Sequence, residues 1–293
     1  MDYKAELRNL KVTKDYFIGI DSDGCVFDTM EIKQKECFCP NFIKHFGLQA
    51  ASKFAREVWQ FVNLYSKTRG CNRFLAVQTA IALINDWDVF AARGLDKKEL
   101  PELDAWIDIE TKLGNPALEI KVAETNNPEL KMLLNWSLEV NERIQDMVYG
   151  ISPFPKVRES LQYAEDKADM IVVSQTPFEA LNREWKENSL DSFVEYIAGQ
   201  EAGTKTEHLQ YAATDKYDPK KILMIGDAPG DLKAAEKNNV LFYPIIPGKE
   251  EFSWEKFNNE ALKKFFADEY AGSYQKSLLG DFEKALPKTP PWK

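Results

Sequence analysis

The fold class is decided by the stretch Tyr16–Gly24, which reads YFIGIDSDG. Its apolar part runs without alternation and ends abruptly at Asp21, which is typical of a strand covered on both faces of a parallel sheet. Similar apolar runs occur at 170–173, 194–198, 222–225 and 240–246. Helix-length amphipathic stretches separate them, at 156–167, 177–188, 204–213 and 229–238. This alternation predicts an α/β fold with a doubly wound parallel sheet.

The strand signals disappear over about 120 residues after the first strand. Apolar residues there recur at helical spacing, as in Phe54, Val58, Phe61, Val62 and Tyr65. A segment of this length is enough for a domain of its own. We therefore expect two domains: an α/β core formed by residues 1–28 and 150–293, and an all-helical insertion at 29–149.

The amino-acid composition and net charge of the chain disfavour two classes of binding partner. The chain has 293 residues, of which 44% are hydrophobic, and its 47 acidic against 38 basic residues give a net charge of −9. A surface of this charge repels nucleic acid and anionic lipid, so we expect neither as a partner. No run approaches the roughly eighteen apolar residues that cross a membrane, and the charged start lacks the apolar segment of a secretory signal.

The number and positions of the cysteines indicate a protein of a reducing compartment. The four cysteines lie in the first quarter of the sequence, at Cys25, Cys37, Cys39 and Cys71. They are too few and too bunched for a disulfide framework in a chain of this length. We expect a cytoplasmic protein that acts on a small molecule, and a monomer and a homodimer both remain open.

Polar residues follow the ends of several predicted strands. They are Asp21, Ser22 and Asp23, then Ser174, Gln175 and Thr176, and finally Asp227 and Asp231, with Lys205 after the third strand. The carboxyl ends of parallel strands meet at one edge of the sheet, where ligands bind. Carboxylates gathered at one edge repel each other unless a cation lies among them, and oxygen ligands without histidine or cysteine favour Mg²⁺. The pattern therefore predicts a magnesium site and phosphoryl chemistry.

This ordered set of motifs resembles the haloacid dehalogenase superfamily, and the helical insertion resembles that superfamily's type-1 cap, in the branch of β-phosphoglucomutase and related phosphatases. The resemblance implies that Asp21 is a nucleophile that forms an aspartyl-phosphate. Asp23 would be the general acid and base. Ser174 would donate a hydrogen bond to a phosphoryl oxygen, and Lys205 would neutralise charge on the nucleophile and the phosphate.

The resemblance also implies a ligand set for Mg²⁺. Asp227 would bind the ion together with the Asp21 side chain and the backbone carbonyl of Asp23. Asp231 would support the metal shell or Lys205.

The turn after the first strand would contribute to substrate binding. Backbone amides between Ser22 and Gly24 can donate hydrogen bonds to a phosphate, and glycine permits a close approach. Gln175 is a further candidate for contacting the substrate. The family commonly has threonine where this chain has Cys25. We expect Cys25 to be a small buried residue, with a nucleophilic thiol as the alternative.

A second basic motif lies in the helical insertion, in the sequence Ser66–Phe74. It resembles the substrate loop in the cap of β-phosphoglucomutase-like proteins, with Arg69, Gly70 and Arg73 at the positions of that family's basic residue, glycine and arginine. The resemblance implies that these residues bind the leaving group, and an arginine fork suits a carboxylate or phosphate. The alternative is a solvated charged turn between two helices.

The function expected from these residues is a Mg²⁺-dependent phosphatase that hydrolyses a small phosphorylated metabolite through an aspartyl-phosphate. Dehalogenation is disfavoured, because it needs no acid two residues after the nucleophile, and Asp23 is present. Two alternatives remain open: a sugar phosphomutase of the β-phosphoglucomutase type, and a non-catalytic binding module with the same fold.

Overall fold

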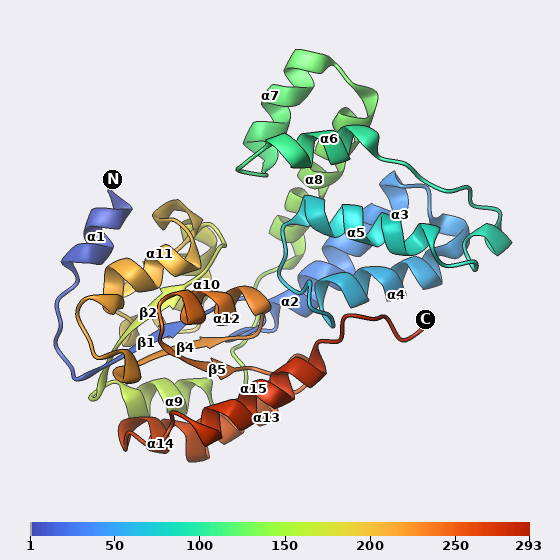
Figure 1. The fold of residues 1–293 in the computed structure, drawn as a ribbon. Coiled ribbons are helices and arrows are strands. Elements are labelled where there is room, and N and C mark those ends of the chain that lie inside the picture. Colours follow the sequence, from blue (N-terminus) through green and yellow to red (C-terminus); the bar gives the residue numbers. More distant parts are fainter. Residues whose placement is uncertain (1) are drawn as a thin grey trace. The chain divides into compact units, whose positions relative to one another are not determined.

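The computed structural model describes residues 2–293 and divides them into two compact units (Figure 1). The core unit comprises the chain up to Met30 and Gly150–Pro287, and the helical unit comprises Glu31–Tyr149 and Lys288–Lys293. The chain passes between the two units after Met30, after Tyr149 and after Pro287. The domain boundaries expected from the sequence, after residues 28 and 149, stay a prediction.

The core unit is built on one parallel sheet with the strand order β3-β2-β1-β4-β5. The strands are β1 (Tyr16–Ile20), β2 (Ala168–Val173), β3 (Tyr196–Ala198), β4 (Ile222–Gly226) and β5 (Leu241–Pro244). The α-helices are α1 (Tyr3–Asn9), α9 (Val157–Ala164), α10 (Phe178–Glu187), α11 (Lys205–Leu209), α12 (Pro229–Lys237), α13 (Glu250–Lys256), α14 (Leu262–Phe266) and α15 (Ser273–Ala285). The predicted fold class is confirmed.

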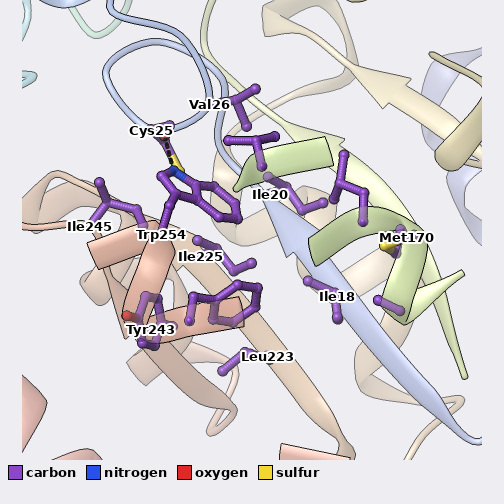
Figure 2. Packing of buried hydrophobic residues seen from close by; sticks show 14 of the residues in the cluster. Ile18, Ile20, Cys25, Val26, Met170, Leu223, Ile225, Tyr243, Ile245 and Trp254 are labelled. Atoms are coloured by element: carbon purple, nitrogen blue, oxygen red, sulfur yellow. Dashed lines mark hydrogen bonds between the residues drawn. The ribbon is translucent and has the colours of Figure 1, made fainter. Parts of the chain in front are cut away.

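Strands β2, β4 and β5 are buried along their whole length and β1 is buried after Tyr16, which explains the continuous apolar runs in the sequence, whereas Tyr196 and Ile197 of β3 are half-buried. Ile18, Met170 and Leu223 belong to a cluster with residues of α9, α10, α13 and α14 (Figure 2). The alternate residues Phe17 and Ile171 belong to a second cluster with residues of α1, α11 and α12. Successive side chains of a strand point to opposite faces, so two helical layers require apolar residues at every strand position.

The helical unit has no named strand among its described residues. Its helices are α3 (Cys39–His45), α4 (Ser52–Asn63), α5 (Arg73–Asn85), α6 (Pro101–Ile109), α7 (Asn115–Thr125) and α8 (Pro128–Met147), and α2 (Thr29–Ile32) leads into it. Aromatic side chains fill its centre, where the rings of Phe42, Trp59 and Trp136 contact one another in sequence. Among residues 2–293, no helix combines the length and the apolar character needed to cross a membrane.

The C-terminal segment is part of the core of the helical unit. The Trp292 ring stacks on Trp87, with 4.5 Å between ring centroids and 7° between planes, and meets the edge of Phe61 at 5.5 Å. Lys293 forms an ion pair with Asp86. Because α15 packs on β5, the chain between α15 and Trp292 is a third covalent connection between the units.

Trp292→Ala should destabilise the helical unit by about 1–3 kcal/mol, because it removes a partly buried indole from between two aromatic rings. Lys293→Ala should have a much smaller effect on stability, since the ion pair with Asp86 is exposed to solvent. Urea denaturation of the two variants and the parent protein measures both values. Equal midpoints for Trp292→Ala and the parent would show that the segment is not part of the unit's core.

Candidate active site

The site is built on the loop that follows β1, where Asp21 extends the strand pairing by donating its N–H to the Ile225 carbonyl at 3.0 Å. The chain then turns tightly, because the Ser22 carbonyl accepts the N–H groups of Cys25, Val26 and Phe27 at 2.9–3.3 Å. This turn holds Asp21 and Asp23 at the carboxyl edge of the sheet.

The acidic cluster consists of Asp21, Asp227 and Asp231, all of which are buried. Lys205 Nζ lies 2.9 Å from Asp21 Oδ1 and 2.6 Å from Asp231 Oδ1. Three carboxylates with one ammonium leave an excess of negative charge in a region with little solvent. Such an excess is stable only with proton uptake or an additional cation.

Burial sets the acid–base behaviour of this cluster. Burial raises the pKa of Asp21 well above its ordinary value, and the Lys205 ammonium offsets only part of this rise. Burial also raises the pKa of Asp231. Burial alone would lower the pKa of Lys205, but the carboxylates of Asp21 and Asp231 outweigh it and raise that pKa, so Lys205 stays charged.

The carboxylates fit a hard divalent cation. One oxygen each of Asp21, Asp227 and Asp231 lies within 4.8 Å of the others, and Mg²⁺ prefers oxygen ligands of this kind. Both oxygens of Asp231 already have partners, because Oδ1 contacts Lys205 and Oδ2 accepts the Ala228 N–H at 3.0 Å. Asp231 is therefore better suited to orient its neighbours than to bind an ion directly.

Local sequence signals place Lys205 and Asp231. Lys205 begins α11 behind a capping box, in which Thr204 Oγ1 accepts the Glu207 N–H at 3.2 Å and Glu207 Oε2 accepts the Thr204 N–H at 2.8 Å. Asp231 lies in the first turn of α12 against Gly226, where an added Cβ would come within 2.4 Å of the Asp231 side chain. Glycine at 226 is therefore required for this packing.

Ser174 and Gln175 follow β2, as expected. The Ser174 N–H donates to the Ala198 carbonyl at 3.0 Å, and the serine side chain is buried. The Gln175 amide donates to the Gly203 carbonyl at 2.9 Å and so joins this loop to the segment before α11. Their contact with a substrate remains a prediction.

The Ser22 hydroxyl and the Gly24 N–H both form hydrogen bonds within the protein. The Ser22 hydroxyl is turned into the core, where it accepts a hydrogen bond from Trp185 Nε1 at 3.0 Å and donates to Glu184 Oε2 at 3.2 Å. The Gly24 N–H donates to the Phe27 carbonyl at 2.8 Å, and its φ of +74° explains the glycine. Substrate binding by these two groups remains a prediction.

Cys25 is buried beneath the loop, and its carbonyl accepts a hydrogen bond from Trp254 Nε1 at 2.7 Å (Figure 2). Burial raises the pKa of the Cys25 thiol well above its ordinary value, and the neighbouring carboxylates add to this rise. A thiol is a poor nucleophile, so this environment favours the packing role over the nucleophilic one.

Asp23 has two partners to which the sequence analysis gives no role. Thr29 Oγ1 donates to Asp23 Oδ1 at 2.5 Å, and Thr176 Oγ1 donates to Oδ2 at 2.6 Å. Thr176 lies two residues after Ser174, so the strand-end rule already brings it to this edge of the sheet, although the sequence gives it no role. The Asp23 side chain is absent from the group of acids suited to a metal ion, which leaves its backbone carbonyl as the predicted ligand.

The basic loop of the helical unit is more buried than a solvated turn. Arg69 is buried and donates from Nη1 to the Leu64 carbonyl at 2.9 Å. Arg73 Nη1 donates to Ser137 Oγ and Asn141 Oδ1, each at 2.8 Å. Burial lowers the pKa of Arg73 to about 10. Gly70 has a φ of +72°, which suits the turn between the arginines. Substrate binding by Arg69, Gly70 and Arg73 remains a prediction.

We expect the buried side chain of His208 to make the core unit less stable at acidic pH. His208 lies one turn after Lys205 on α11, fully buried, and burial lowers its pKa from 6.5 to about 4. Between these values the unfolded chain binds more protons than the folded one, so stability rises with pH by up to about 1.4 kcal/mol per pH unit.

His208→Gln should therefore lose less stability than the parent protein between pH 6.5 and pH 4.5, by about 2 kcal/mol. Urea denaturation at the two pH values measures the difference, and His45→Gln in the helical unit is the control. Identical pH dependence for His208→Gln and the parent would contradict this assignment.

Just over half of the chain matches the model of a known protein family. A family model described as Haloacid dehalogenase-like hydrolase matches residues 90–245, just over half of the chain. The matched range contains Ser174, Lys205, Asp227 and Asp231 and leaves out the loop after β1. No curated protein matches the sequence.

Several solved structures are similar to this chain at low sequence identity, with TM-scores below 0.5. One is a haloacid dehalogenase-like family hydrolase from Streptococcus pneumoniae, with 12% identity, a TM-score of 0.44 and coverage of 83% of this chain and 92% of that chain. Another is described as a predicted phosphoglycolate phosphatase from Haemophilus somnus, with 13% identity, a TM-score of 0.46 and coverage of 80% and 86%. A third, described as a predicted phosphatase from Clostridium acetobutylicum, has 14% identity, a TM-score of 0.42 and coverage of 79% and 85%.

Proposed function

We propose, because this chain belongs to the haloacid dehalogenase-like hydrolase family, that it hydrolyses the phosphate monoester of a small metabolite with Asp21 as the nucleophile. One observation carries the proposal. Asp21 lies in a buried cluster that contains Lys205 at 2.9 Å together with Asp227 and Asp231. A positive charge beside Asp21 offsets the repulsion between its carboxylate and the phosphate, so the carboxylate can attack phosphorus.

Mg²⁺ is the cation that this cluster would hold, through the side chains of Asp21 and Asp227 and the backbone carbonyl of Asp23. When bound, it would offset the repulsion between the nucleophile and the phosphate and stabilise the charge on the phosphoryl oxygens. Asp231 would keep Lys205 directed at Asp21, as its 2.6 Å contact indicates.

The first step transfers the phosphoryl group to the protein. An Asp21 oxygen attacks phosphorus, the bond between phosphorus and the ester oxygen breaks, and the Asp23 carboxyl gives its proton to the departing oxygen. Ser174 donates a hydrogen bond to a phosphoryl oxygen, and Lys205 balances the negative charge. The product of this step is an aspartyl-phosphate and the free alcohol.

The second step releases phosphate. A water molecule attacks phosphorus, Asp23 takes a proton from it, and the bond between phosphorus and the Asp21 oxygen breaks. Inorganic phosphate leaves, and both carboxyl groups return to their starting state.

A panel of phosphorylated metabolites, assayed with and without Mg²⁺, tests this function. We expect continuous release of inorganic phosphate from at least one member, and loss of that release when the metal is chelated. Interconversion of two sugar phosphates without net phosphate release would contradict the proposal and support a phosphomutase. Binding without any reaction would support the non-catalytic module.

A further inference from the structure

Both oxygens of the Asp23 carboxyl accept a hydrogen bond from a threonine hydroxyl, at 2.5 Å from Thr29 and 2.6 Å from Thr176. The terminal torsion of an aspartate is broad, so hydrogen bonds of this kind decide which way the carboxyl plane faces.

Thr176 is itself fixed by the ends of two strands. Its N–H donates to Ser174 Oγ at 3.2 Å, and its carbonyl accepts the Gln200 N–H at 3.1 Å. Gly199, the residue after β3, lies so close that an added Cβ would come within 2.8 Å of the Thr176 carbonyl oxygen. The threonine hydroxyl is therefore held at a defined place at the edge of the sheet.

The two threonines hold Asp23 from different parts of the chain. Thr29 begins α2, the helix along which the chain passes from the core unit into the helical unit. Thr176 lies between β2 and α10, inside the core unit. Both contacts with Asp23 lie within the core unit.

We propose that Thr176 is a positioning residue, which orients the Asp23 carboxyl for proton transfer to the departing oxygen and from the attacking water. This inference rests on the proposed function, in which Asp23 is the acid and base. Thr176 takes no part in bond making, and it acts by limiting the rotation of the Asp23 side chain.

The role has a consequence that depends on the leaving group. When the ester bond breaks, an alkoxide must receive the Asp23 proton, whereas p-nitrophenolate is stable without it. In the second step water must lose a proton to the Asp23 carboxylate for both esters. After p-nitrophenyl phosphate, Asp23 first releases its unused proton to solvent. Misorientation of Asp23 therefore slows the first step for alkyl esters only and slows the second step for both substrates.

The experiment compares Thr176→Val, which keeps the shape and loses the donor, with Thr176→Ser, which keeps the donor. For an alkyl phosphate taken from the metabolite panel, Thr176→Val should lower kcat/KM by about 10- to 100-fold. For p-nitrophenyl phosphate, kcat/KM should fall by less than about threefold, while kcat falls and a burst of p-nitrophenol appears. Thr176→Ser should stay within about threefold of the parent on both substrates.

A general structural defect gives a different result. Equal losses of kcat/KM on both substrates, or no loss on either, would overturn the inference. Thr176→Ala is a second variant without the donor, and it must reproduce the pattern of Thr176→Val. Thermal denaturation of each variant verifies that the fold is retained.

Asp23→Ala separates the inference from the proposed function. If Asp23→Ala loses far more activity on the alkyl phosphate than on p-nitrophenyl phosphate and Thr176→Val does not, only the inference about Thr176 fails. If Asp23→Ala shows no such difference, the acid role of Asp23 fails, and the inference fails with it.

Discussion

Asp21→Asn should abolish phosphate release, with a loss of at least about 10³-fold in kcat, and should leave the fold intact. The amide has nearly the volume of the carboxyl group, so the packing around this buried residue is preserved. It has no negative charge and cannot form an acyl phosphate. Steady-state phosphate assays measure the loss, and Asp215→Asn, at an exposed position of the core unit, should retain full activity.

Retention of more than about one per cent of activity by Asp21→Asn would contradict the covalent mechanism. Circular dichroism and thermal denaturation of the same preparation are needed to exclude unfolding as the cause of a loss.

Lys205→Met should have the second large effect, because it removes the ammonium that contacts both Asp21 and Asp231. The methionine fills similar space, but two buried carboxylates lose their compensating charge. We expect kcat to fall by about 10²- to 10³-fold and the protein to lose roughly 3–5 kcal/mol of stability at neutral pH.

Phosphate assays and urea denaturation measure these two effects. Lys233→Met is the matched control, since Lys233 is exposed on α12 and should be silent in both assays. A Lys205→Met protein with parental activity would show that the ammonium does not balance charge in the reaction.

Much of this site was predictable from the sequence, because its residues follow the carboxyl ends of the predicted strands. A parallel sheet brings the carboxyl ends of its strands to one edge, so the residue types after each apolar run already indicate which side chains meet. That rule was enough to bring together Asp21, Lys205, Asp227 and Asp231, which the structure places in one buried cluster.

Side-chain direction and long-range partners were not predictable in this way. The Ser22 hydroxyl is turned into the core because Trp185, 163 residues away, donates a hydrogen bond to it. Arg73 donates hydrogen bonds to the neutral side chains of Ser137 and Asn141 on α8. The sequence of the basic loop does not indicate these partners. Trp292 belongs to the helical unit because its ring stacks on Trp87. No local sequence pattern indicates this contact.

If Asp21 carries the phosphoryl group during the reaction, borohydride should trap it as a modified residue. Borohydride reduces an aspartyl-phosphate to homoserine, which lowers the mass of that residue by about 14 Da. The protein is mixed with substrate and Mg²⁺, quenched with borohydride, digested with trypsin and analysed by mass spectrometry. We expect the mass change at Asp21 within the peptide Asp15–Lys33, only when substrate is present and never in Asp21→Asn. Modification at another aspartate, or none in a preparation that turns over substrate, would show that Asp21 is not the nucleophile.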